Sequence, residues 1–145
     1  MSVRSLQLDD IPYLLQHLRP EDIEEAAMLC GRLSLEDALT LATFLESYVY
    51  VDDADNPQVV FGRYQAYDIC HVWMLGTGFI TNYPYALHKW AVRILDTWST
   101  QTLACLSYIP NRVHGVWLKR LGFIPIQQQG QFMIYIKPII KPIRA

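Results

Sequence analysis

Asn111 and His114 are the two residues whose types and spacing most suggest a binding or catalytic pair. They stand three residues apart at the beginning of a helix expected over 113–121. If both point into the cleft between the two central strands, they form a polar pair that is able to bind a ligand or a partner. In the alternative interpretation Asn111 caps the helix and His114 makes a local hydrogen bond.

Other residue types with chemical potential are scattered. The run 52–57 is rich in acidic oxygens but lacks the six-ligand spacing and distal glutamate of a calcium loop, so a solvated hairpin turn is expected. No second histidine or carboxylate stands at zinc-site spacing, and no metal is expected. The acidic run 21–25 is expected to favour a helix N-terminus and to be solvated. The cysteines are odd in number and far apart, which predicts small buried residues in a reducing compartment: Cys30, Cys70 and Cys105.

Composition predicts a folded domain. The 145 residues are 52% hydrophobic and 18% charged, which excludes disorder as the main state. A net charge of −2 gives no global basic field, so nucleic acid is an unlikely partner. The apolar stretches are too short for a membrane span, and the first ten residues show no signal-peptide pattern. We expect one domain over 1–136 and an extended tail over 137–145, because the prolines of the tail exclude a central strand.

The elements that must position these residues follow from periodicity and turn signals. The expected order is strand, three helices, three strands, helix, strand, helix and two strands. The strongest helical pattern covers 85–98, and the most continuously apolar strand, 69–75, is expected to be central. This order predicts an α/β (α+β) fold, with a mixed central sheet flanked by helices.

The stretch 111–123, which runs from an asparagine through a helix to Gly122 and Phe123, resembles the closing motif of GCN5-related N-acetyltransferases. The element order resembles that fold as well. A more specific resemblance is to the small acetyltransferase-like internal virion proteins of short-tailed bacteriophages and prophages. It rests on the segments 18–25, 72–77, 111–114, 117–123 and 130–132.

The resemblance implies a place for acetyl-CoA after the strand 69–75. There a diphosphate needs free backbone N–H groups at a helix N-terminus, and a thioester carbonyl needs a donor from a splayed central strand. The residues that the resemblance places there are Leu75, Gly76, Thr77 and Gly78, with Asn111 as a further cofactor-binding candidate. Pro84, at the expected helix start, has no N–H to offer, so the loop makes a poor phosphate cradle.

The proton donor of the acetyltransferase pattern is also missing. The resemblance places a tyrosine four residues before the glycine of the Gly-Phe pair, and this chain has Leu118 there. Tyr83 and Tyr108 are the candidates to replace it, and His114 is a separate catalytic candidate. Aromatic packing and local hydrogen bonding are the alternative interpretation of all three.

Three functions are open on this sequence. The leading hypothesis is a non-catalytic acetyltransferase-like phage protein that requires no cofactor. It would act in the virion interior or its assembly through contacts with virion proteins or its own subunits. The second is an acyl-CoA-dependent N-acyltransferase with a degenerate diphosphate loop, for which acetyl-CoA is the cofactor. The third is a host-directed binding protein in the host cytoplasm.

Overall fold

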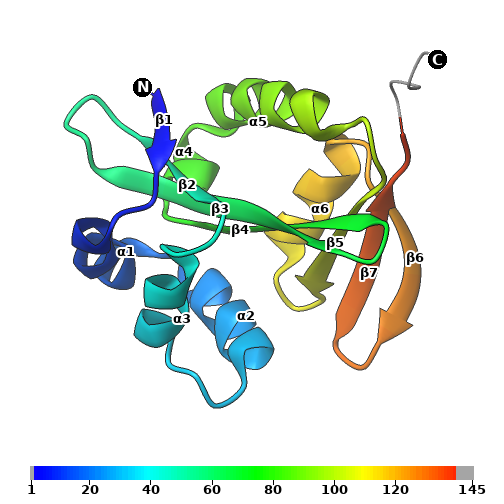
Figure 1. Ribbon diagram of the computed structural model, residues 1–145, viewed down its shortest axis with the longest axis horizontal. Coiled ribbons are helices and arrows are strands. Elements are labelled where there is room, and N and C mark those ends of the chain that lie inside the picture. Colours follow the sequence, from blue (N-terminus) through cyan, green and yellow to red (C-terminus); the bar gives the residue numbers. More distant parts are fainter. Residues whose placement is uncertain (1, 140–145) are drawn as a thin grey trace. The chain divides into compact units, whose positions relative to one another are not determined.

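The computed structural model describes residues 2–139 (Figure 1). By its internal contacts the chain forms two compact units. Unit 1 comprises Met1–Arg63 and Trp73–Tyr83, and unit 2 comprises Tyr64–Val72 and Pro84–Ala145. The single-domain organisation expected from the sequence stays a prediction. Lys137, expected to begin the tail, is instead the last residue of a strand, and most of that tail lies outside the described residues.

The strands form a seven-stranded mixed sheet in the order β1-β2-β3-β4-β5-β7-β6. Their bounds are β1 Ser2–Ser5, β2 Ser47–Val51, β3 Pro57–Ala66, β4 Ile69–Gly76, β5 Leu103–Tyr108, β6 Ile124–Gln129 and β7 Phe132–Lys137. The helices are η1 Leu8–Asp10, α1 Ile11–His17, α2 Pro20–Cys30, α3 Leu35–Ala42, α4 Phe79–Asn82, α5 Pro84–Trp98 and α6 Arg112–Arg120. The predicted α/β class and the central place of β4 are confirmed.

Two helices differ from the sequence prediction. The apolar spacing of residues 35–45 predicts a helix through Leu45, but α3 ends at Ala42, whose carbonyl accepts the Ser47 hydroxyl at 2.6 Å. The short helix α4 was not predicted. It ends at Tyr83, whose backbone leaves the helical region because Pro84 follows. No described helix is long and apolar enough to cross a membrane.

The core of unit 1 is an apolar cluster between the three N-terminal helices and the strands β2–β4. Leu14 and Val49 are fully buried within it, and Leu39 of α3 is 2% exposed. The start of α3 follows the predicted capping pattern, because the Ser34 hydroxyl accepts the Asp37 amide at 3.1 Å. Helices α1, α2 and α3 gather on the same side of β2 and β3 (Figure 1).

Unit 2 contains the only parallel strand pair described by a register. β4 and β5 pair through Cys70 with Leu103 and His71 with Ala104. β5 then pairs antiparallel with β7 along its whole length, and β7 pairs with the edge strand β6. Helix α6 packs against β5 and β6.

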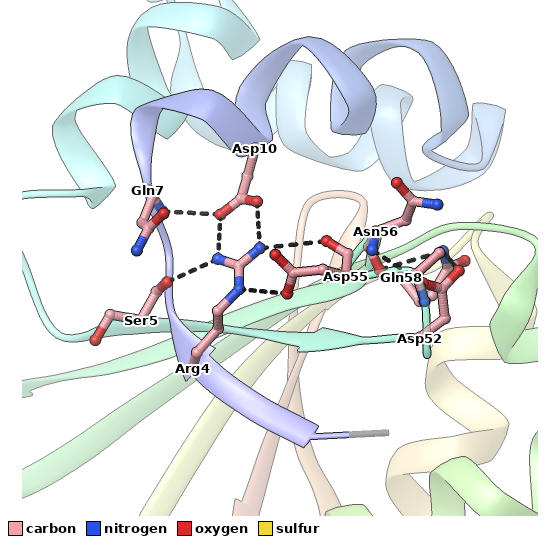
Figure 2. A network of polar contacts seen from close by, with 9 residues as sticks. Arg4, Ser5, Gln7, Asp10, Asp52, Asp55, Asn56 and Gln58 are labelled. Atoms are coloured by element: carbon pink, nitrogen blue, oxygen red, sulfur yellow. Dashed lines mark hydrogen bonds and ion pairs between the residues drawn. The ribbon is translucent and has the colours of Figure 1, made fainter.

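A buried carboxylate ties the N-terminal strand of unit 1 to its first helices (Figure 2). Asp10 is 5% exposed and accepts two hydrogen bonds from the Arg4 guanidinium, at 2.7 and 2.8 Å. It also accepts the Gln7 amide at 2.9 Å, which satisfies an otherwise unpaired donor at the start of η1. Arg4 reaches Asp55 as well, at 3.0 Å, but Asp55 is 72% exposed. Asp10, as the largest cause, raises the pKa of Arg4.

A buried lysine joins β7 to the end of α6 in unit 2. Lys137 is 7% exposed, and its ammonium donates to the Leu121 carbonyl at 3.0 Å. That carbonyl lies at the C-terminus of the helix, where a positive charge is favourable. Burial nevertheless lowers the pKa of Lys137, because desolvation disfavours the charged form.

Asp10→Asn should lower the free energy of unfolding by about 2 kcal/mol, because it removes the charge from a buried, doubly hydrogen-bonded pair. Asp55→Asn is the matched control. It makes the same chemical change at an exposed site, and asparagine tolerates the positive φ of 63° found there, so about 0.5 kcal/mol or less is expected. Urea unfolding followed by circular dichroism measures both. Equal losses would show that Asp10 has no special role.

Lys137→Met should flatten the dependence of stability on pH in the alkaline range. The folded protein releases the Lys137 proton at a lower pH than the unfolded chain, whose lysine titrates near 10.5. Between these two pKa values the unfolded chain binds more protons, so wild-type stability gains a contribution as pH rises. Urea midpoints between pH 8 and 11 test this. Lys119→Met, at an exposed position on α6, should leave the slope unchanged; an identical slope in Lys137→Met would contradict the prediction.

Candidate functional site

The end of β4, where the resemblance places the cofactor, is held by the N-terminal helices of unit 1. The Gly76 amide donates to the Asp22 carboxylate at 2.7 Å, and the Gly76 carbonyl accepts the Arg19 amide at 2.9 Å. Leu18 forms an isolated antiparallel bridge with Thr77. Residues of the α1–α2 segment thus pair with the strand end through both side chain and backbone.

Asp22 is neutralised in place by Arg19. The guanidinium of Arg19 lies 3.2 Å from the Asp22 carboxylate, and the two residues are 9% and 4% exposed. Glu25, one turn further along α2, is 2% exposed. The interpretation of 21–25 as a solvated acidic run is therefore wrong for these two acids. They lie on the buried face of the helix, whereas Glu21 is 51% exposed.

Six further backbone amides of this loop and of α4 are also engaged within unit 1, and the candidate Gly78 has no amide donation among them. The Thr77 hydroxyl accepts the Phe79 amide at 3.2 Å, which turns the chain into α4. The other amide donations are Thr77 to Gln58 O, Ile80 to Thr77 O, Thr81 and Asn82 to Gly78 O, and Tyr83 to Phe79 O. Seven of the eight residues from 76 to 83 therefore donate their amide hydrogen to the protein itself.

This arrangement does not fit the diphosphate of acetyl-CoA. A phosphate cradle requires several backbone N–H groups that point away from the protein. Here the candidates Gly76 and Thr77 donate theirs to Asp22 and Gln58, and α5 begins with Pro84, which has no N–H. Leu75 is buried and precedes these residues in β4.

The tyrosine candidates fall into different units. Tyr83, in unit 1, is 56% exposed and stacks on Phe79 with ring centroids 4.9 Å apart. Tyr108, in unit 2, is 5% exposed, and its ring lies 5.4 Å from that of Phe132. Packing therefore accounts for the position of both rings, and their catalytic role stays a prediction. Leu118, at the expected donor position, is buried and apolar.

His114 is 5% exposed and lies in a polar cluster between α6 and β5. Its Nδ1 lies 3.3 Å from the Ser107 hydroxyl, and its Nε2 lies 3.9 Å from the Cys105 sulfur. Both strand residues are buried, at 2% and 4% exposed. A histidine beside a serine and a thiol has the elements of nucleophilic catalysis, but these side chains are closed off from solvent. The local-contact interpretation of His114 fits this geometry.

Tyr135 belongs to the same part of unit 2 and was missed by the sequence analysis. It pairs with Cys105 across β5 and β7, and burial first, then the Cys105 thiol, raises the pKa of its hydroxyl. A β-carbon on Gly115 would lie 3.1 Å from that hydroxyl, so the glycine lets α6 approach the sheet closely.

Asn111 stands at the predicted cap position directly before α6, and its backbone amide donates to the Tyr108 carbonyl at 2.9 Å. The expectation that its side chain caps the helix is wrong, because the side chain makes no capping hydrogen bond and is 2% exposed. Its backbone torsions, φ −83° and ψ 75°, differ from the extended conformation usual for a capping residue. Its proposed role in cofactor binding stays a prediction.

The cysteine prediction holds for Cys70 and Cys105, which are buried, whereas Cys30 is only half-buried. Burial raises the pKa of the Cys30 thiol. Across residues 2–139, no group of three or more histidine, cysteine, aspartate or glutamate side chains is placed to hold a metal ion.

Solved acetyltransferase structures match nearly the whole chain. A GNAT-family acetyltransferase from Bacillus anthracis superposes with a TM-score of 0.71 at 8% identity, over 96% of this chain and 95% of that one. The PaiA N-acetyltransferase of Thermoplasma acidophilum, in complex with coenzyme A, gives 0.65 at 12% identity, over 94% and 98%. This chain has the GCN5-related N-acetyltransferase fold.

The ribosomal-protein-S18-alanine N-acetyltransferase of Escherichia coli is a further match. Its TM-score is 0.64 at 12% identity, over 99% of this chain and 96% of that one. No family model and no curated protein matches the sequence. At these identities the acetyltransferase fold is what the likeness shows, and the residues must decide the function.

Ser107→Ala and His114→Ala should be coupled by about 1 kcal/mol in a double-mutant cycle on the free energy of unfolding, because their side chains share a hydrogen bond. Ser99→Ala is the matched control. Ser99 is equally buried, but its hydroxyl donates to the Leu95 carbonyl, so its effect should add to that of His114→Ala. Additivity of Ser107→Ala and His114→Ala would show that the two side chains do not interact.

Proposed function

We propose that this protein keeps the acetyltransferase fold as a non-catalytic binding module. The most direct support is that seven backbone amides between residues 76 and 83 donate to Asp22, to Gln58 or within the loop itself. A second observation supports it independently, because a buried leucine stands at position 118 where the fold family commonly has its proton donor. The loss of either the diphosphate-binding amides or the proton donor would already slow acetyl transfer severely.

The biological setting that we propose is a short-tailed phage or prophage. The resemblance of 72–77, 111–114 and 117–123 to acetyltransferase-like internal virion proteins supports it. On this proposal the protein acts in the virion interior or during assembly, through contacts with virion proteins or its own copies. Mass spectrometry of purified virions tests the setting, and absence of the chain from particles that carry the gene would contradict a virion role.

Acetyl-CoA should not stabilise the protein. A ligand with a dissociation constant of 10 μM, present at 1 mM, would add about 2.7 kcal/mol to stability and raise the melting temperature measurably. We expect no shift at 1 mM coenzyme A or acetyl-CoA, and no heat in titration calorimetry. An acetyltransferase that binds coenzyme A serves as the positive control. Micromolar binding would overturn the proposal and favour an N-acyltransferase with an altered loop.

A further inference from the structure

The charges of this chain are segregated between its two units, which the overall net charge of −2 conceals. Unit 1 contains four arginines, no lysine and twelve acidic residues, a net charge of −8. Unit 2 contains eight basic residues against Asp68 and Asp96, a net charge of +6. A separation of this size creates opposite surface potentials, which direct association.

The acidic charge of unit 1 accompanies exposed apolar side chains on α2, α3 and the turn after α3. This segment, residues 20–46, is termed the acidic hairpin; it contains seven acidic residues and one cation, Arg32. Five of the seven acids are exposed, all except Asp22 and Glu25. Phe44 is 80% exposed and Leu45 is 69% exposed. The other large apolar residues exposed there are Met28, Leu29, Leu33 and Leu41. Large exposed apolar groups rimmed by charge are typical of interaction surfaces.

Unit 2 presents a surface of the opposite charge on α6. The exposed residues of this helix fall at positions i, i+1, i+4, i+7 and i+8, which lie on one face. This α6 stripe consists of Arg112, Val113, Val116, Lys119 and Arg120. The opposite face is buried through His114 and Leu118. The stripe thus has an apolar centre flanked by three cations.

We infer that the acidic hairpin of one copy of this chain docks on the α6 stripe of a second copy. Two hairpins facing each other would bring two acidic surfaces together, and like charges at an interface are costly. Docking of the acidic hairpin on the α6 stripe instead pairs opposite charges around two apolar centres. The large apolar and charged residues that define each surface are exposed.

This contact is heterologous, because it joins two different surfaces. Each copy in a pair therefore keeps one unused hairpin or one unused stripe, and association continues head to tail into a chain or a closed ring. The inference does not depend on whether coenzyme A binds, since neither surface includes the loop after β4.

Sedimentation velocity tests the contact in wild-type protein. At about 50 mM salt the mean mass should rise with protein concentration, and at 0.5 M salt it should fall towards the monomer, because salt screens the charges. Wild-type protein that remains monomeric at low salt would overturn the inference. Association that strengthens with salt would also overturn it, since an apolar contact between identical faces behaves in that way.

Two variants separate the surfaces. The hairpin variant, Phe44→Ser with Leu45→Ser, and the stripe variant, Lys119→Glu with Arg120→Glu, should each weaken self-association at least tenfold while circular dichroism stays unchanged. Mixed together they should form a one-to-one dimer that grows no further, because one intact hairpin meets one intact stripe. A mixture that stays monomeric would refute a hairpin–stripe contact. A stripe variant that still associates would show that the hairpin has another partner surface.

Matched controls change the same chemistry elsewhere. Lys89→Glu with Arg93→Glu inverts two exposed charges on α5 of the same unit, and Leu8→Ser removes an apolar residue of unit 1 that is 58% exposed. Both controls should self-associate within about twofold of wild type. If Lys89→Glu with Arg93→Glu weakened self-association as much as the stripe variant does, net charge alone would explain the effect. That result would overturn a specific contact.

Discussion

The hydrogen bond from the Gly76 amide to the Asp22 carboxylate is the interaction on which the functional interpretation depends. It is 2.7 Å long, it is buried, and the Arg19 guanidinium neutralises its acceptor. An unpaired buried carboxylate would cost several kcal/mol, so this three-residue arrangement forms as a unit. Because the carboxylate comes from α2, the packing of that helix also fixes the end of β4.

Backbone amides that acetyl transfer requires as free donors therefore form hydrogen bonds within unit 1 instead. The loop turns into α4 through the Thr77 hydroxyl and then stops before Pro84. In unit 2 the polar residues of β5 are likewise turned inward, where Ser107 and Cys105 contact His114. The polar groups near both strand ends therefore stabilise local packing.

The sequence predicts the elements of this fold better than the relations between them. Ser34 and the proline-led helix starts are local signals, and the structure places helices there. Helix α4 was missed because four residues give no periodicity. The hydrogen bond of Asp22 was missed because its partner, the Gly76 amide, is 54 residues away in the sequence. Nothing in the local sequence distinguishes Asp22 from the other acids of 21–25. Asn111 heads its helix as predicted, yet its side chain faces the interior.

The charge segregation has a physical explanation in how unit 1 uses its cations. Three of its four arginines are committed to ion pairs with acids of the same unit, Arg4 with Asp10, Arg19 with Asp22 and Arg63 with Glu46. Guanidinium groups suit this task because their fork-like geometry matches a carboxylate. The buried carboxylates of Asp10 and Asp22 are thereby neutralised, whereas Glu24 and Glu36 are exposed. The arginines that stabilise unit 1 thus do not offset the charge of its exposed acids, and its surface stays acidic.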